Sequence, residues 1–81
     1  MMNGLTINYD REGDILFIHK CPPYGEQEME ELDDEILVRL NPETDTIEAI
    51  EIFFFSKRLD NPFTLPIVAD LQLPQPAMLD A

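Results

Sequence analysis

The stretch that decides the fold is residues 8–20, NYDREGDILFIHK, in which an acidic segment separates two apolar runs. Residues 5–9 alternate apolar and polar side chains, which is typical of a half-buried strand. Residues 14–19 are mostly apolar, which is typical of a strand covered on both faces. Between them, Asp10 can accept a hydrogen bond from the backbone two residues on, and Gly13 can adopt a positive φ. The stretch therefore predicts a β-hairpin.

The same stretch spaces three carboxylates, Asp10, Glu12 and Asp14, two residues apart, as the beginning of a calcium loop does. A calcium loop also needs glycine at its sixth position and oxygen ligands further on. Here Gly13 is the fourth residue, and apolar strand residues occupy the later ligand positions. We therefore prefer the turn. A carboxylate-based calcium-binding protein is the alternative function.

A second pair of apolar runs, residues 35–40 and 46–54, surrounds a turn at residues 41–45. The apolar positions of the last run change phase, which indicates a β-bulge near Ala49 and Ile50. The two pairs together predict a mainly β fold, bordering on α+β, with a four-stranded antiparallel sheet made of two hairpins.

The end of the chain carries four prolines and is predicted to be largely extended. Residues 56–60 are expected to form one helical turn with Ser56 as N-cap. Residues 65–71 are β-branched enough for a short edge strand. We expect one small β domain over residues 1–60, followed by a tail, residues 61–81, that packs on the sheet or on a second subunit.

The composition narrows the classes of function. The chain has 81 residues and a net charge of −12, with 17 acidic and 5 basic residues. This charge disfavours binding to nucleic acid and to anionic membranes, and favours a basic partner. Cys21 is the only cysteine, so no internal disulfide can form. Without a signal peptide or an apolar span, we expect a cytoplasmic protein.

The acidic segment at residues 26–35 is the main candidate for a binding site. It can be a solvated connection, or a helical turn that directs Met29, Leu32 and Ile36 inward. It can also be a surface that attracts a small basic protein, because its like charges repel one another until a cation is bound. The carboxylates are those of Glu26, Glu28, Glu30, Glu31, Asp33, Asp34 and Glu35.

Three successive phenylalanines, Phe53, Phe54 and Phe55, cannot all face one side of a strand. Either the strand is covered on both faces, or it ends there and the chain turns into a helix. A chain this short has little core, so a second copy is a plausible cover. We expect a homodimer or tail packing at these rings.

The sequence carries no catalytic pattern. His19 has no nucleophile arranged around it, and with Cys21 it supplies only two of the ligands that a zinc site needs. Glycine-rich phosphate loops are absent as well. We expect no enzyme activity, no cofactor and no metal.

Two motifs resemble a family of small bacterial proteins known as Domain of Unknown Function 2283. These are Tyr-Asp-x-Glu-x-Asp-x-Leu-Phe-Ile at residues 9–18 and Ile-Glu-Ala-Ile-Glu-Ile at residues 47–52, with Ile-Leu-Val-Arg-Leu between them. The resemblance covers roughly residues 5–58, and Ala49 stands where the family pattern has glycine. It implies a four-stranded antiparallel sheet with a short C-terminal helix, and no catalytic residues. Some members are encoded beside small toxin-like proteins, which suggests an antitoxin-like role.

Overall fold

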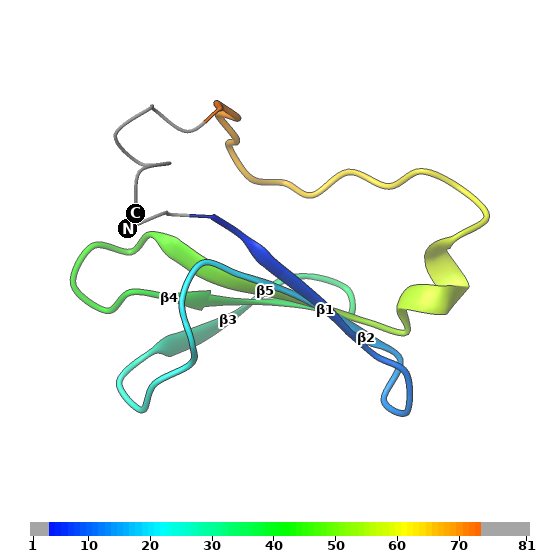
Figure 1. Cartoon of the computed structure of the whole chain (residues 1–81), viewed down its shortest axis with the longest axis horizontal. Helices are drawn as coiled ribbons and strands as arrows, with labels where there is room; N and C mark the ends of the chain where they lie inside the picture. The colour runs from blue at the N-terminus through cyan, green and yellow to red at the C-terminus, as the bar shows by residue number, and fades with distance from the viewer. Residues whose placement is uncertain (1–3, 74–81) are drawn as a thin grey trace.

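The computed structural model describes residues 4–73 and shows one antiparallel sheet of five strands (Figure 1). The strands lie side by side in the order β1-β2-β5-β4-β3, so β5 is central and β1 and β3 are the edges. A 3-10 turn, η1, follows β5, and residues 59–73 have no regular structure. The elements are β1 (Thr6–Asp10), β2 (Ile15–His19), β3 (Glu28–Asp33), β4 (Ile36–Leu40), β5 (Ile47–Phe53) and η1 (Phe55–Arg58).

The predicted mainly β class and both hairpins are confirmed, since β1 pairs with β2 and β4 with β5. The predicted number of strands is wrong, because residues 28–33 of the acidic segment form a fifth strand that pairs with β4. Met29 and Leu32 are three residues apart, a spacing that suggested a helical turn. On an edge strand the same spacing directs them to opposite faces, while the carboxylates stay in solvent.

Two predictions for the end of the chain are wrong. Residues 65–71 form no strand; the amide of Ile67 donates to the carbonyl of Leu65 at 2.8 Å, and Pro66 has no amide to offer a ladder. Ser56 is not an N-cap. Phe54, with a φ of 53°, precedes the 3-10 turn, and no side chain caps it.

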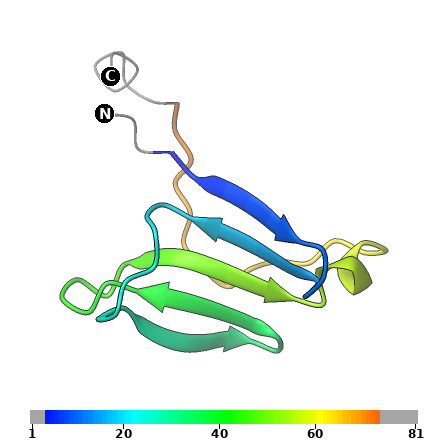
Figure 2. The same ribbon diagram turned by 60° about the horizontal axis from the view of Figure 1, so that its bottom comes forward.

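The two faces of the sheet differ in what covers them. One face, here called the tail face, carries the most buried residues, Ile36, Val38 and Ile52, which are 1–2% exposed. Residues 59–73 run over this face and pass behind the sheet in Figure 2. The opposite face, here called the open face, points towards the viewer of Figure 2. The most buried side chains therefore lie on the tail face of the central strands.

A β-bulge interrupts the regular pairing of β4 with β5 near the end of β4. Arg39 pairs with Ala49, but Leu40 pairs with Ile47, which leaves Glu48 as the extra residue. A bulge was predicted near Ala49 and Ile50, so the prediction is close and the bulged residue is Glu48. Because Glu48 is the bulged residue, its side chain can accept hydrogen bonds from the neighbouring loops.

Candidate functional site

The acidic segment forms one edge of the sheet. All seven of its carboxylates, on β3 and in the turns at either end of it, belong to exposed residues. Within residues 4–73 the ion pair between Arg39 and Glu51 is the only one, so none of the seven is neutralised by a described cation. The structure thus brings the predicted partner-binding residues together along one edge.

A groove of about 770 Å³ runs beside this edge strand. Its apolar lining comes from Leu32 on β3, from Val38 and Leu40 on β4, and from Ile47 on β5. Carboxylates of Glu28, Glu30 and Asp45 also line it. The combination suits a ligand with an apolar side chain flanked by positive charge.

Arg58 fixes the turn at one end of β3. Its Nη2 donates to the carbonyl of Asp34 at 2.8 Å, and its guanidinium lies 5.0 Å from the centre of the Phe63 ring. The amide of Phe53 donates to the carbonyl of Glu35 at 2.9 Å, and Glu35 has a φ of 61°. The turn between β3 and β4 is therefore held by β5, η1 and the start of the tail.

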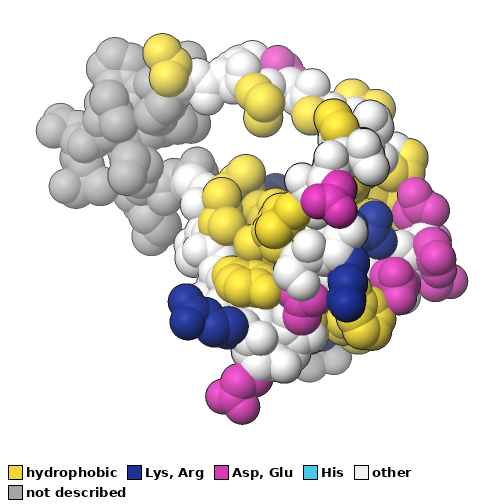
Figure 3. All heavy atoms as spheres, turned by 90° about the vertical axis from the view of Figure 1, so that its right-hand side faces the viewer, with side chains coloured by type: hydrophobic (Ala, Val, Ile, Leu, Met, Phe, Trp, Pro, Cys, Tyr) yellow, Lys and Arg dark blue, Asp and Glu magenta, His cyan; other side chains and the backbone are white. Residues whose placement is uncertain are grey.

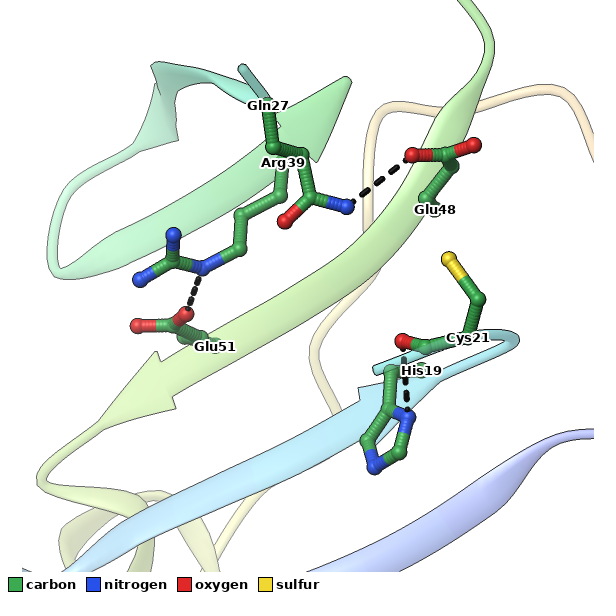
Figure 4. Close-up of polar contacts among 6 residues, drawn as sticks. All are labelled: His19, Cys21, Gln27, Arg39, Glu48 and Glu51. Atoms are coloured by element: carbon green, nitrogen blue, oxygen red, sulfur yellow. Dashed lines mark hydrogen bonds and ion pairs between the residues drawn. The ribbon is translucent and has the colours of Figure 1, made fainter. Parts of the chain in front are cut away.

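Glu48 fixes the other end of β3. Its carboxylate accepts hydrogen bonds from Tyr24 Oη at 2.6 Å, from Gln27 Nε2 at 2.9 Å and from Asn41 Nδ2 at 3.1 Å. Gln27 directly precedes β3, and Figure 4 shows its amide pointing to Glu48. These donors, Tyr24 first, lower the pKa of Glu48, and the same hydrogen bond together with desolvation raises the pKa of Tyr24 to about 12.

Glu48 and Arg58 hold the two ends of β3, and the sequence did not identify either residue. The phase change in β5 was the available signal for Glu48, because a bulged residue projects away from the regular ladder. For Arg58 there was no signal, since its contact with Asp34 joins residues that are 24 positions apart. Both act by positioning β3.

Two carboxylates of the first turn, those of Asp10 and Asp14, accept hydrogen bonds from other parts of the chain. Asp10 Oδ1 accepts from the amides of Glu12 and Gly13 at 3.2 and 3.3 Å, as predicted for a turn. Asp14 accepts from Tyr9 Oη at 2.6 Å, and from the amide and hydroxyl of Ser56 at 2.9 and 2.7 Å. The Tyr9 and Ser56 hydrogen bonds lower the pKa of Asp14.

This geometry gives the calcium alternative no support. Among residues 4–73, no group of three or more His, Cys, Asp or Glu side chains is arranged to hold a metal ion. Asp14, the third carboxylate of the motif, instead ties the first hairpin to η1. The predicted positive φ of Gly13 is also wrong, because the left-handed residue is Asp14, with a φ of 56°.

Gly13 is nevertheless constrained. A Cβ atom on it would lie 2.9 Å from Asp10 Oδ2 and 3.2 Å from Ile15 Cδ1. A side chain at this position would therefore displace the ends of the Asp10 and Ile15 side chains, and the φ value itself does not call for glycine.

The open face carries a separate polar cluster. Arg39 Nε donates to Glu51, which is only 8% exposed, and His19 Nδ1 lies 3.1 Å from the carbonyl of Cys21 (Figure 4). The Cys21 thiol is free and half-buried. Because β4 and β5 pair side by side, the buried Glu51 carboxylate is compensated by the neighbouring strand.

The three phenylalanines do not form one surface. Phe53 ends β5 and is half-buried, whereas Phe54 is left-handed and 50% exposed. Phe55 packs edge-to-face on Tyr9, with ring centres 5.9 Å apart. Of the two alternatives, the chain takes the second: the strand ends and rotates into a short helical element.

The described residues contain no helix long and apolar enough to cross a membrane.

The comparisons with known proteins concern the sheet. Neither curated proteins nor solved structures gave a match. A family model described as "Protein of unknown function (DUF2283)" matches residues 6–56, which run from β1 to η1 and make up well over half of the chain. The chain therefore belongs to the DUF2283 family.

Proposed function

We propose that the chain is a non-enzymatic, cytoplasmic protein-interaction module that binds a basic protein through β3 and the groove beside it. One observation carries the proposal: seven carboxylates lie on one sheet edge without a described cationic partner, next to an apolar groove. Exposed edge strands present unpaired backbone groups, and the acidic side chains of β3 discourage pairing between identical chains.

The edge suggests how a partner is recognised. An extended basic segment can add to β3 as a further strand, with main-chain hydrogen bonds for affinity and alternating side chains for specificity. Lysine or arginine would meet Glu28 and Glu30, while an apolar side chain would enter the groove over Leu40. A segment without basic side chains would leave the carboxylates unpaired. A segment without the apolar side chain would leave the groove filled with water.

The most concrete form of this proposal is an antitoxin-like inhibitor of a small basic toxin. The support is the acidic edge, together with the resemblance to a family in which some members are encoded beside toxin-like proteins. Electrostatic steering would make the association fast and sensitive to salt.

Affinity capture from the native host with matched variants tests the proposal. The test variant, Glu28→Gln/Glu30→Gln/Glu31→Gln, removes three charges from β3. The control, Glu12→Gln/Glu43→Gln/Asp70→Asn, removes three exposed charges elsewhere. We expect a basic protein to be retained by the native chain and the control, and to elute from the test variant at much lower salt. Equal retention by both variants would refute a role for β3.

A further inference from the structure

A second apolar surface lies at the opposite end of the sheet from β3. Its first part is a strip along the β1 edge formed by Leu5, Ile7 and Tyr9, which are 60%, 66% and 41% exposed. Residues at every second position of an extended strand share one face, so these three side chains form one row. We call this row the β1 strip.

The second part is formed by apolar side chains of the tail. Val68, Leu71 and Leu73 are 101%, 87% and 89% exposed. The tail also leaves a gap of about 400 Å³ above the sheet, between Ile67–Leu71 on one side and residues including Leu5, Ile18 and Ile50 on the other. Figure 3 shows this opening, with apolar side chains on both sides of it. Both parts of the surface therefore lie on the tail face.

The β1 strip and the tail together expose several large apolar side chains. Leu5, Ile7, Val68, Leu71 and Leu73 are each 60% or more exposed. Because the strip and the tail belong to the same chain, a second copy offers an apolar counterpart to each of them at once.

The distribution of charge also favours a second copy. Residues 5–20, which contain β1 and β2, carry three carboxylates and two basic side chains, whereas residues 26–35 carry seven carboxylates and no basic one. Four strand spacings, about 19 Å, separate the β1 and β3 edges, which is more than two Debye lengths of about 8 Å. Two such acidic chains can therefore meet on the β1 side with their acidic edges far apart.

We propose that two copies form a two-fold dimer in which the tail of each covers the β1 strip of the other. In such an isologous interface Ile7 of one copy meets Val68 or Leu71 of its partner, and the reverse contact forms at the same time. This proposal is independent of the basic partner, because it uses the opposite edge of the sheet.

Mass measurement by light scattering across a dilution series tests the dimer. We expect the native chain at twice its monomer mass, and Val68→Asp to weaken dimerisation about tenfold or more. Val68 makes no buried contact in the monomer, so this variant still folds. Met29→Asp, at a 54% exposed apolar residue on β3, is the matched control and should remain dimeric. A monomeric native chain, or equal effects of the two substitutions, would overturn the proposal.

Crosslinking tests the arrangement itself. In a Cys21→Ser background, chains carrying only Ile7→Cys are mixed with chains carrying only Val68→Cys and treated with a short bismaleimide. We expect a covalent product of the two different chains, whereas Met29→Cys mixed with Val68→Cys should give little. Equal crosslinking of both mixtures would show that the tail does not lie on the β1 strip of a partner.

Discussion

Asp14 connects the first hairpin to the segment that follows β5. Its carboxylate joins Tyr9 on β1 to Ser56 on η1, and its carbonyl accepts from the amide of Phe55 at 3.0 Å. The sequence predicted the turn, but it favoured Gly13 as the left-handed residue. Asp14 takes that conformation, and its side chain accepts three hydrogen bonds. Two of them come from Ser56, 42 positions away, and no local pattern reports this contact.

Asp14→Asn should make stability less dependent on pH. The folded protein lowers the pKa of Asp14, so its contribution to stability is complete above the ordinary value of 3.8 and is lost as the pH falls through the folded value. Thermal unfolding followed by circular dichroism should show a lower Tm for Asp14→Asn at pH 7. The difference from the native chain should shrink towards pH 2. A difference that does not change with pH would contradict this account.

Tyr24 should lose its proton at a higher pH than an ordinary tyrosine. The Glu48 hydrogen bond, with desolvation, raises its pKa to about 12. A raised pKa means that the stabilisation is complete below pH 10 and is lost as the pH rises through about 12. Ultraviolet titration of the phenolates should show this late transition, and Glu48→Gln should bring it closer to pH 10. An unchanged transition in Glu48→Gln would show that Glu48 is not the cause.

At the level of elements, the central strands were predictable and the acidic edge strand was not. Residues 15–19, 36–40 and 47–53 are rich in branched apolar residues, and both hairpins follow from them. An edge strand buries little, so β3 is formed by pairing with β4 and not by an apolar pattern of its own. The two-residue turn at Asp34 and Glu35, directly before an apolar strand, was the one available signal.

Phe54→Gly should be more stable than Phe54→Ala. Phe54 adopts a left-handed conformation with a φ of 53°, which costs an L-residue about 1–2 kcal/mol and glycine almost nothing. Since the ring is 50% exposed, both substitutions lose similar packing. In chemical unfolding, the free energy of unfolding should be about 1 kcal/mol higher for the glycine variant than for the alanine variant. The reverse order would mean that residue 54 is not left-handed in the folded protein.

The whole molecule presents two different edges, an acidic one at β3 and an apolar one at β1. The sequence predicted an acidic segment and an apolar first strand, but it could not place them on opposite edges, because strand order depends on long-range pairing. It assigned a dimer contact or tail packing to the three phenylalanines, and the β1 strip and the tail expose further apolar side chains.

The two associations should respond to salt in opposite ways. Binding of a basic partner should weaken as salt rises, because screening removes the attraction to β3. The dimer should hold or tighten, because salt screens the repulsion between two chains of net charge −12 and leaves apolar burial in place. Dissociation constants measured at low and high salt by light scattering and by calorimetry would separate the two. A dimer that dissociates in high salt would contradict this division.

Recognition of a basic partner through β3 is most directly tested by an NMR titration. The ¹⁵N-labelled chain is titrated with the captured basic protein while the amide resonances of both sheet edges are followed. The structure predicts the largest shifts at β3 and at the groove residues Leu40 and Ile47, with β1 unchanged as the internal control. Shifts centred on β1, or spread evenly over the sheet, would contradict the proposal that the acidic edge strand is the binding site.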